Sequence, residues 1–265
     1  MSEPAATGHA PVNGVEMYWE SRGSGGVPLI VAHGGFGLAA MFGGLLDALA
    51  ERRRVIAIEL QGHGHTRDVD RDLSYEALGD DIAALIEHLE LGRADLFGFS
   101  LGAGASLRCA IQHHDRVRRL ALLSFPCRRD GWFPEVLAGM GEVSAAGFSQ
   151  MRRSPMYSAW AAVAPDRDAF PALMDKVGAL LRRPYDFSEE VARLPMPVLL
   201  AYADCDSIAP AHAAEFFALL GGGLRDAGWE GPLPTPSSLA ILPGQSHYDV
   251  HTSPLLAPVL ERFLS

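Results

Sequence analysis

The chain has 265 residues, of which 48% are hydrophobic and 20% are charged, the balance of an ordinary globular protein with room for one large α/β domain. The formal net charge of −10 argues against a surface that binds nucleic acid or an anionic membrane. No apolar run approaches the length of a membrane span, and residues 1–11 lack the basic and apolar regions of a signal peptide.

The first elements expected along the chain are extended. Asn13-Gly14 separates two short extended runs, and both residues tolerate positive φ, so this segment predicts a β-hairpin. Helical patterns follow over residues 39–52 and over a segment that Ser74 caps and that runs to about Leu91. Short apolar runs that indicate buried strands alternate with helical segments, at residues 28–32, 55–58, 94–97, 117–123, 197–202 and 239–242. This alternation predicts a mostly parallel central sheet with helices on both faces.

The alternation stops in the middle of the chain. We interpret residues 126–194 as a mostly helical cap inserted into a core domain formed by residues 1–125 and 195–265. The aromatic and methionine side chains of the cap either line a pocket over the sheet or pack the cap's own small core. The candidates for the pocket are Trp132, Phe133 and Trp160. Residues 221–238, which are rich in glycine and proline around Trp229, predict a long surface loop.

Three cysteines, Cys109, Cys127 and Cys205, are odd in number and show no paired spacing. Such a set is typical of reduced thiols rather than of a disulfide framework. We therefore expect a cytoplasmic protein.

The residues Gly98-Phe99-Ser100-Leu101-Gly102 join one of these strands to a helix and are typical of a nucleophile elbow. A tight turn there forces the serine into a strained backbone conformation, and glycine two positions away on each side avoids a collision of side chains. The Ser100 hydroxyl then stands at a helix N-terminus, where the dipole favours developing negative charge. The alternative is a Gly/Ser turn without chemistry, because so short a motif also arises by chance.

A serine hydroxyl becomes a good nucleophile only when a base removes its proton, and the base needs an acid that holds its tautomer. In this architecture both partners must come from the carboxyl ends of later strands. The loop after strand 197–202 carries Asp204 and Asp206, and the loop after strand 239–242 carries His247. The chain order of serine, aspartate and histidine is the one expected for such a fold.

With these residues in place, the chain resembles a member of the α/β-hydrolase superfamily. The resemblance extends from Val27 onward and is weakest over residues 125–194. Four parts carry it: the oxyanion loop His33–Gly37, the stretch Glu59–Thr66 after the next strand, the elbow, and the acid and histidine loops at 206–210 and 244–247. Each match alone is weak, whereas the four together are a strong signal.

The resemblance implies an α/β-hydrolase fold in which Ser100 is the nucleophile, His247 the general base and acid, and Asp206 the orienting carboxylate. Asp206 is favoured over Asp204 because its spacing to Pro210 matches the family pattern Asp-x-x-x-Pro. Some relatives carry the acid after the preceding strand instead, where this chain has the carboxylate-free run Ser124-Phe125-Pro126. His251 is a rival base, but it lies toward the final helix and lacks the glycine context of His247.

By the same resemblance, backbone amides form the oxyanion hole. Leu101 is expected to donate one hydrogen bond, and the second comes from Gly35 or, next in order, from Phe36, which is also a candidate to contact substrate. No cofactor or metal is implied. The pairs His63-x-His65 and His247-x-x-x-His251 have spacings that a metal could use, but both lie in motifs that need none.

The leading hypothesis for function is hydrolysis of a carboxylic ester of a small, largely apolar molecule through an acyl-enzyme on Ser100. Serine at the elbow argues against dehalogenase and epoxide hydrolase chemistry, in which a carboxylate attacks carbon. The same triad serves thioester, lactone and C–C hydrolysis and cofactor-free perhydrolysis, as in the non-haem haloperoxidases. An alternative of another class is a non-catalytic receptor for small molecules. The expected partner is a small acyl substrate, not nucleic acid or membrane, and a homodimer is left open.

Overall fold

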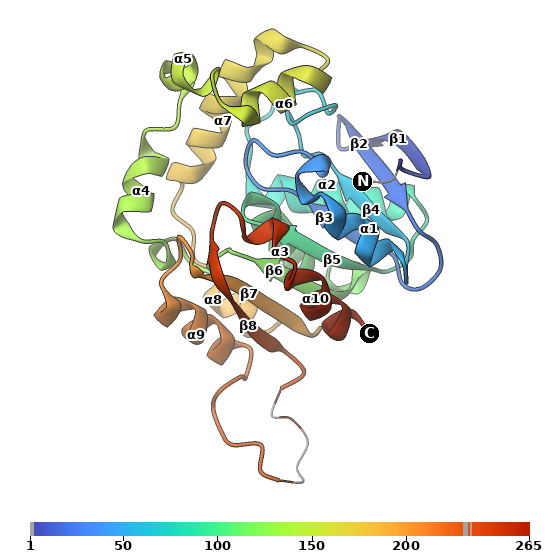
Figure 1. Cartoon of the computed structure of the whole chain (residues 1–265), viewed down its shortest axis with the longest axis vertical. Coiled ribbons are helices and arrows are strands. Elements are labelled where there is room, and N and C mark those ends of the chain that lie inside the picture. Colours follow the sequence, from blue (N-terminus) through green and yellow to red (C-terminus); the bar gives the residue numbers. More distant parts are fainter. Residues whose placement is uncertain (1–2, 230–232, 234) are drawn as a thin grey trace.

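The computed structural model describes residues 3–229, 233 and 235–265. Eight strands form one sheet in the order β1-β2-β4-β3-β5-β6-β7-β8 (Figure 1). β1 (Ala6–Val12) and β2 (Val15–Arg22) form the predicted hairpin, in which Asn13 and Gly14 both have positive φ. β2 also runs antiparallel to its other neighbour, β4. From β4 onward, each pair of neighbouring strands is parallel. These parallel strands are β3 (Leu29–Ala32), β4 (Val55–Ile58), β5 (Ala94–Phe99), β6 (Val117–Leu123), β7 (Val198–Cys205) and β8 (Ser238–Ser246).

Helices cover both faces of this sheet, as predicted. Alternate residues of β3 show the division, because Leu29 and Val31 lie in one core and Ile30 and Ala32 in the other. The first core is closed by α1 (Gly44–Ala50) and α10 (Leu256–Leu264), and the second by α2 (Tyr75–His88), α3 (Leu101–Gln112) and α9 (Pro210–Leu219). The central strands β3, β4 and β5 are buried along their whole length, which explains their continuous apolar runs.

Two predicted helices end differently in the structure. The segment expected as one helix over residues 39–52 is a 3₁₀ turn, Ala39–Phe42, followed by α1, and Gly43 between them has a φ of 53°. That left-handed residue breaks the helical path, so the single helix was a wrong prediction. The predicted N-cap residue of α2 is confirmed, since the Ser74 side chain accepts a hydrogen bond from the Ala77 amide. The helix ends at His88 rather than near Leu91.

The segment predicted as a cap is helical. It contains α4 (Pro134–Gly141), α5 (Phe148–Met151), α6 (Pro155–Val163), α7 (Phe170–Arg182) and α8 (Ser188–Val191). Figure 1 shows α4 to α7, in green to yellow, gathered beyond one end of the sheet, whereas α8 lies against α9 of the core. The division of the chain into a core domain and a cap stays a prediction.

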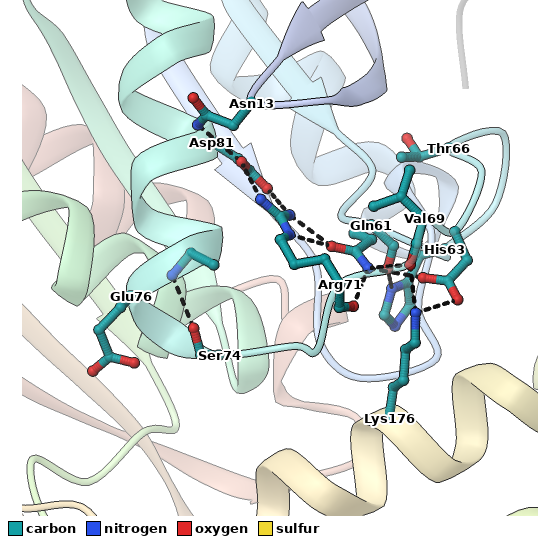
Figure 2. A network of polar contacts seen from close by, with 12 residues as sticks. Asn13, Gln61, His63, Thr66, Val69, Arg71, Ser74, Glu76, Asp81 and Lys176 are labelled. Atoms are coloured by element: carbon teal, nitrogen blue, oxygen red, sulfur yellow. Dashed lines mark hydrogen bonds and ion pairs between the residues drawn. The ribbon is translucent and has the colours of Figure 1, made fainter.

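A network of polar contacts holds α7 against the loop that follows β4 (Figure 2). Lys176 of α7 donates to the Val69 carbonyl and forms an ion pair with Asp68 at 2.7 Å. Asp68 accepts from the Gln61 amide group, and Gln61 accepts in turn from Arg71. Arg71 then pairs with the fully buried Asp81 of α2, which also accepts from Asn13. The network therefore joins the cap, the loop and the core.

The segment predicted as a surface loop follows α9. Its described residues up to Ser237 form turns and coil, with Leu224, Trp229 and Leu233 exposed, and Ser238 already begins β8. Residues 230–232 and 234 lie outside the described part of the chain. Within the ranges that the structure describes, no helix is both long and apolar enough to cross a membrane.

Candidate active site

Ser100 occupies the sharp turn between β5 and α3. Its φ of 50° is the strained, left-handed conformation expected of an elbow serine. The Ser100 amide donates to the Leu123 carbonyl of β6 at 2.9 Å, and its own carbonyl accepts from the first turn of α3. A Cβ on Gly98 would meet the Gly102 backbone across the turn, and a Cβ on Gly102 would meet the backbone of Ala32 and His33 at the end of β3, which is why glycine occupies both positions.

The structure brings Ser100, His247 and Asp206 together. The Ser100 Oγ lies 3.1 Å from His247 Nε2, and His247 Nδ1 lies 2.9 Å from Asp206 Oδ1. The three residues come from the loops after β5, β8 and β7, whose carboxyl ends meet at one edge of the sheet. Because a carboxylate only accepts hydrogen bonds, the imidazole carries its proton on Nδ1, and Nε2 is free to accept from the serine hydroxyl.

The Asp206 carboxylate accepts four hydrogen bonds. Oδ1 accepts from His247 and from the Ser207 amide at 2.7 Å, and Oδ2 accepts from the Ala203 amide at 2.9 Å and the Ser124 hydroxyl at 2.5 Å. Burial acts to raise the pKa of Asp206, but the hydrogen bonds from His247 and Ser124 outweigh it and hold that pKa below its ordinary value. The carboxylate is therefore charged at neutral pH.

Asp204, the rival acid, has a different place. Its exposed carboxylate accepts from the amides of Gly244 at 2.9 Å and Gln245 at 3.1 Å, so it shapes the turn that leads to His247. These amide contacts also lower the pKa of Asp204. The acid that contacts His247 is thus Asp206.

The backbone amides predicted as oxyanion donors lie beside Ser100 and differ in whether they already donate a hydrogen bond. The Phe36 amide already donates to His63 Nε2 at 3.1 Å, so it is not free to bind a substrate oxygen. Gly35 and Leu101 both line the cavity next to Ser100, and neither amide has an acceptor among the described residues. The geometry therefore favours Gly35 and Leu101 over Phe36 as the donor pair.

Two buried histidines hold the loops around this pair. His33 Nε2 accepts from the Leu60 amide at 3.1 Å, and His63 Nδ1 lies 3.0 Å from the Gln61 carbonyl. Burial lowers the pKa of His33 to about 3 and also lowers the pKa of His63, so both rings are neutral. The role of His63 was missed in the sequence, where it stood out only as half of a possible metal pair.

A cavity of about 240 Å³ opens over Ser100 and His247. Among its lining residues there is no lysine, arginine, aspartate or glutamate. The apolar side chains come from the core and the cap, and the larger ones are Phe36, Met41, Tyr75, Phe99, Leu101, Trp132, Met140, Met156, Val177 and Leu181. A second hollow of about 480 Å³ lies between β8 and α10 but shares no lining residue with this cavity, so Ser100 and His247 line only the smaller of the two.

Two of the four predicted substrate contacts lie at the cavity. Phe36 and Trp132 line it, whereas Phe133 and Trp160 do not. Trp160 is only 2% exposed, donates to the Gly62 carbonyl at 3.1 Å and packs edge-on against Phe170 with ring centroids 4.8 Å apart. Its assignment to substrate binding stays a prediction that this placement does not support, because the ring fills the contact between the cap and the loop after β4.

Phe133 also has a structural place, since its amide donates to the Ser207 carbonyl at 3.1 Å just before α4 begins. Several residues that line the cavity were missed instead, and two of them lie close to His247 in the chain. Tyr248, next to His247, is 75% exposed at the cavity, and His251 stacks on Phe99 with centroids 5.0 Å apart. Among the described residues, no cluster of three or more His, Cys, Asp or Glu side chains is placed to hold a metal ion.

Comparison with known proteins gives the same fold. A family model described as alpha/beta hydrolase fold matches residues 27–221. A solved structure of E-2-(acetamidomethylene)succinate hydrolase superposes with a TM-score of 0.75 at 23% sequence identity, over 98% of both chains.

Curated relatives match parts of the chain. The 2-hydroxymuconate semialdehyde hydrolase of Pseudomonas sp. (strain CF600) is 38% identical over 38% of this chain and 39% of its own length. The pimeloyl-[acyl-carrier protein] methyl ester esterase of Nitrosomonas europaea is 28% identical over 76% of this chain and 85% of its own length. The chain thus spans well under half the length of two relatives that are 37% and 38% identical to it. It spans most of the length of the relative that is 28% identical.

Proposed function

Since the chain belongs to the alpha/beta hydrolase fold family, we propose that it is a serine hydrolase that cleaves a carboxylic ester of a small, largely apolar molecule. The observation that carries the proposal is the unbroken series of hydrogen bonds from the Ser100 hydroxyl through His247 to Asp206. A strained serine at a helix N-terminus, with an imidazole nitrogen in position to accept its proton, is the arrangement that acyl transfer needs.

In the first half of the reaction, His247 Nε2 removes the Ser100 proton as Oγ attacks the ester carbonyl carbon. The negative charge that develops on the carbonyl oxygen is bound by the Gly35 and Leu101 amides, and one such donor typically contributes about 3 kcal/mol. The proton on His247 then passes to the alkoxide as the alcohol leaves, and Ser100 carries the acyl group.

The second half repeats these steps with water. His247 takes a proton from the water molecule, the hydroxide attacks the acyl carbon, and the proton returns to the Ser100 oxygen as the carboxylic acid leaves. Asp206 keeps its charge throughout, and its hydrogen bond to Nδ1 holds the imidazole in the required tautomer and stabilises the imidazolium.

The walls of the cavity support an uncharged, apolar substrate. Burial of each methylene against such walls contributes about 0.8 kcal/mol, whereas a carboxylate buried without a cation costs several kcal/mol. The esterase named among the relatives supports the choice of an ester bond. We also place the enzyme in the cytoplasm, because its three cysteines are free thiols and two of them, Cys109 and Cys127, are buried.

A fluorophosphonate probe together with p-nitrophenyl esters of graded chain length tests the proposal. We expect the folded protein to be labelled, the Ser100→Ala variant to be unlabelled, and turnover to rise with chain length until the cavity is full. Folded wild-type protein that neither binds the probe nor hydrolyses any ester would refute it. Bromination that depends on added peroxide, at rates above ester hydrolysis, would move the assignment to perhydrolysis.

A further inference from the structure

Ser124 follows β6 directly and is fully buried beside the proposed acid. Its amide donates to the Ala201 carbonyl of β7 at 2.9 Å, and its φ of 56° is left-handed. A residue other than glycine keeps such a conformation only where its surroundings enforce it, and such residues gather at functional sites. None of the proposed acyl-transfer steps involves this serine.

We propose that Ser124 is a positioning residue whose hydroxyl, by donating to Asp206, fixes the carboxylate relative to His247 and reduces its pull on the imidazole proton. The inference rests on the proposed function, because it concerns the same reaction. Ser124 contacts neither substrate nor the reacting atoms and acts only through Asp206.

The direction of the hydrogen bond follows from its partner. The Asp206 carboxylate has no proton to give, so the Ser124 hydroxyl, 2.5 Å from Oδ2, must donate. The carboxylate group cannot rotate freely, because both of its oxygens accept hydrogen bonds. Any rotation about the Cβ–Cγ bond would lengthen the hydrogen bonds to both oxygens. Loss of the Ser124 hydroxyl leaves Oδ2 with the Ala203 amide alone.

The hydroxyl also spreads the charge of the carboxylate. A donor to Oδ2 withdraws negative charge from the group, so Oδ1 attracts the His247 proton less strongly. Without that donor, Asp206 stabilises the imidazolium more, and His247 keeps its proton to a higher pH. The acid limb of the activity profile should therefore move upward.

Other titratable groups face this pair and do not imitate the effect. His251 shares the Phe99 ring with His247, and burial lowers its pKa, so it stays neutral near neutral pH. Tyr202 donates to the Phe125 carbonyl, and burial raises its pKa far above the working range. The exposed carboxylates of the same loops, Asp204 and Asp249, both have lowered pKa values because they accept from backbone amides.

The backbone of Ser124 offers a matched pair of variants. Ser124→Ala and Ser124→Gly both remove the hydroxyl, but only glycine relieves the left-handed conformation. A structural role alone predicts that the glycine variant is as stable and as active as the wild type. The positioning role predicts that both variants change activity in the same way, whatever their melting temperatures. Ser106→Ala, which removes another buried hydroxyl in α3, is the control.

The experiment measures kcat, KM and the pH profile of kcat/KM on the best p-nitrophenyl ester. For both Ser124 variants we expect a loss of roughly 10-fold in kcat with KM unchanged, which is the loss of one hydrogen bond to a charged group, and an acid limb raised by about half a unit or more. Ser106→Ala should match the wild type. An unmoved acid limb, or activity restored by glycine, would overturn the proposal.

A second readout needs no turnover. The Nδ1 proton of His247, held by Asp206, should give a downfield proton resonance in the wild type that moves in both Ser124 variants and not in Ser106→Ala. A moved resonance in a protein without esterase activity would support the positioning of Asp206 and refute the proposed function. Normal wild-type activity with an unmoved resonance would refute the positioning role alone.

Discussion

The choice between two neighbouring aspartates can be tested with a pair of isosteric substitutions. In Asp206→Asn, an amide group replaces a carboxylate that has four donors around it, so an NH₂ group must face at least one of them. When the NH₂ faces His247, the imidazole proton moves to Nε2, which can then no longer accept from Ser100. In Asp204→Asn, the single side-chain oxygen keeps only one of the hydrogen bonds from the Gly244 and Gln245 amides, but this exposed side chain makes no hydrogen bond to His247.

The expected sizes differ widely. The wrong tautomer in Asp206→Asn should lower kcat by on the order of 10⁴, or about 5 kcal/mol of transition-state stabilisation. Asp204→Asn should keep kcat/KM within about twofold of the wild type. Steady-state ester hydrolysis measures both, with near-UV circular dichroism to show that each variant is folded. An active Asp206→Asn, or an equally inactive Asp204→Asn, would refute the assignment of the acid.

Three further predictions concern stability. Trp160→Phe leaves the Gly62 carbonyl without its donor, so urea unfolding should show a free energy of unfolding lower by about 1–3 kcal/mol, while KM stays unchanged. A changed KM at unchanged stability would return Trp160 to the substrate site. The ion pair between Lys176 and Asp68 is broken by Lys176→Met or by Asp68→Asn, so each variant should speed limited proteolysis within residues 126–194. The double variant should be cleaved little faster than either single one, whereas additive effects would mean that the two residues act separately. Because burial lowers the pKa of His33 to about 3, the unfolded chain binds a proton between pH 6.5 and 3 that the folded chain does not. The stability that is present above pH 6.5 should therefore fall on acidification, by about 5 kcal/mol in full. Urea titrations at a series of pH values should show a flatter slope for His33→Asn.

The parallel core could be predicted because its strands are buried on both faces. Residues 29–32 and 55–58 are apolar at every position, and the structure places a strand at each. The break at Gly43 could not be predicted from periodicity, since the apolar pattern continues through it. The signal was the glycine itself, which the chain needs there for its positive φ.

The meeting of Ser100, His247 and Asp206 was predictable for a topological reason, because loops at the carboxyl ends of parallel strands share one edge. The residues that hold the site in place could not be predicted from the sequence. Ser124 lies 82 residues before Asp206, and His63 lies 27 residues after Phe36, so no local pattern couples these pairs. The aromatic residues of the cap posed a different problem, since the sequence does not tell whether a ring such as that of Trp160 faces a cavity or its own core.

The ion pair between Lys176 and Asp68 has a consequence for anyone who wishes to alter what this enzyme accepts. One partner belongs to α7, and the other to the segment whose His63 secures the Phe36 amide next to Gly35. A foreign cap grafted in place of residues 126–194 without a matching cation would leave Asp68 without its ion pair and this segment without that contact to the cap. Chimaeras of this chain should therefore exchange the cap and residues 61–71 as one piece.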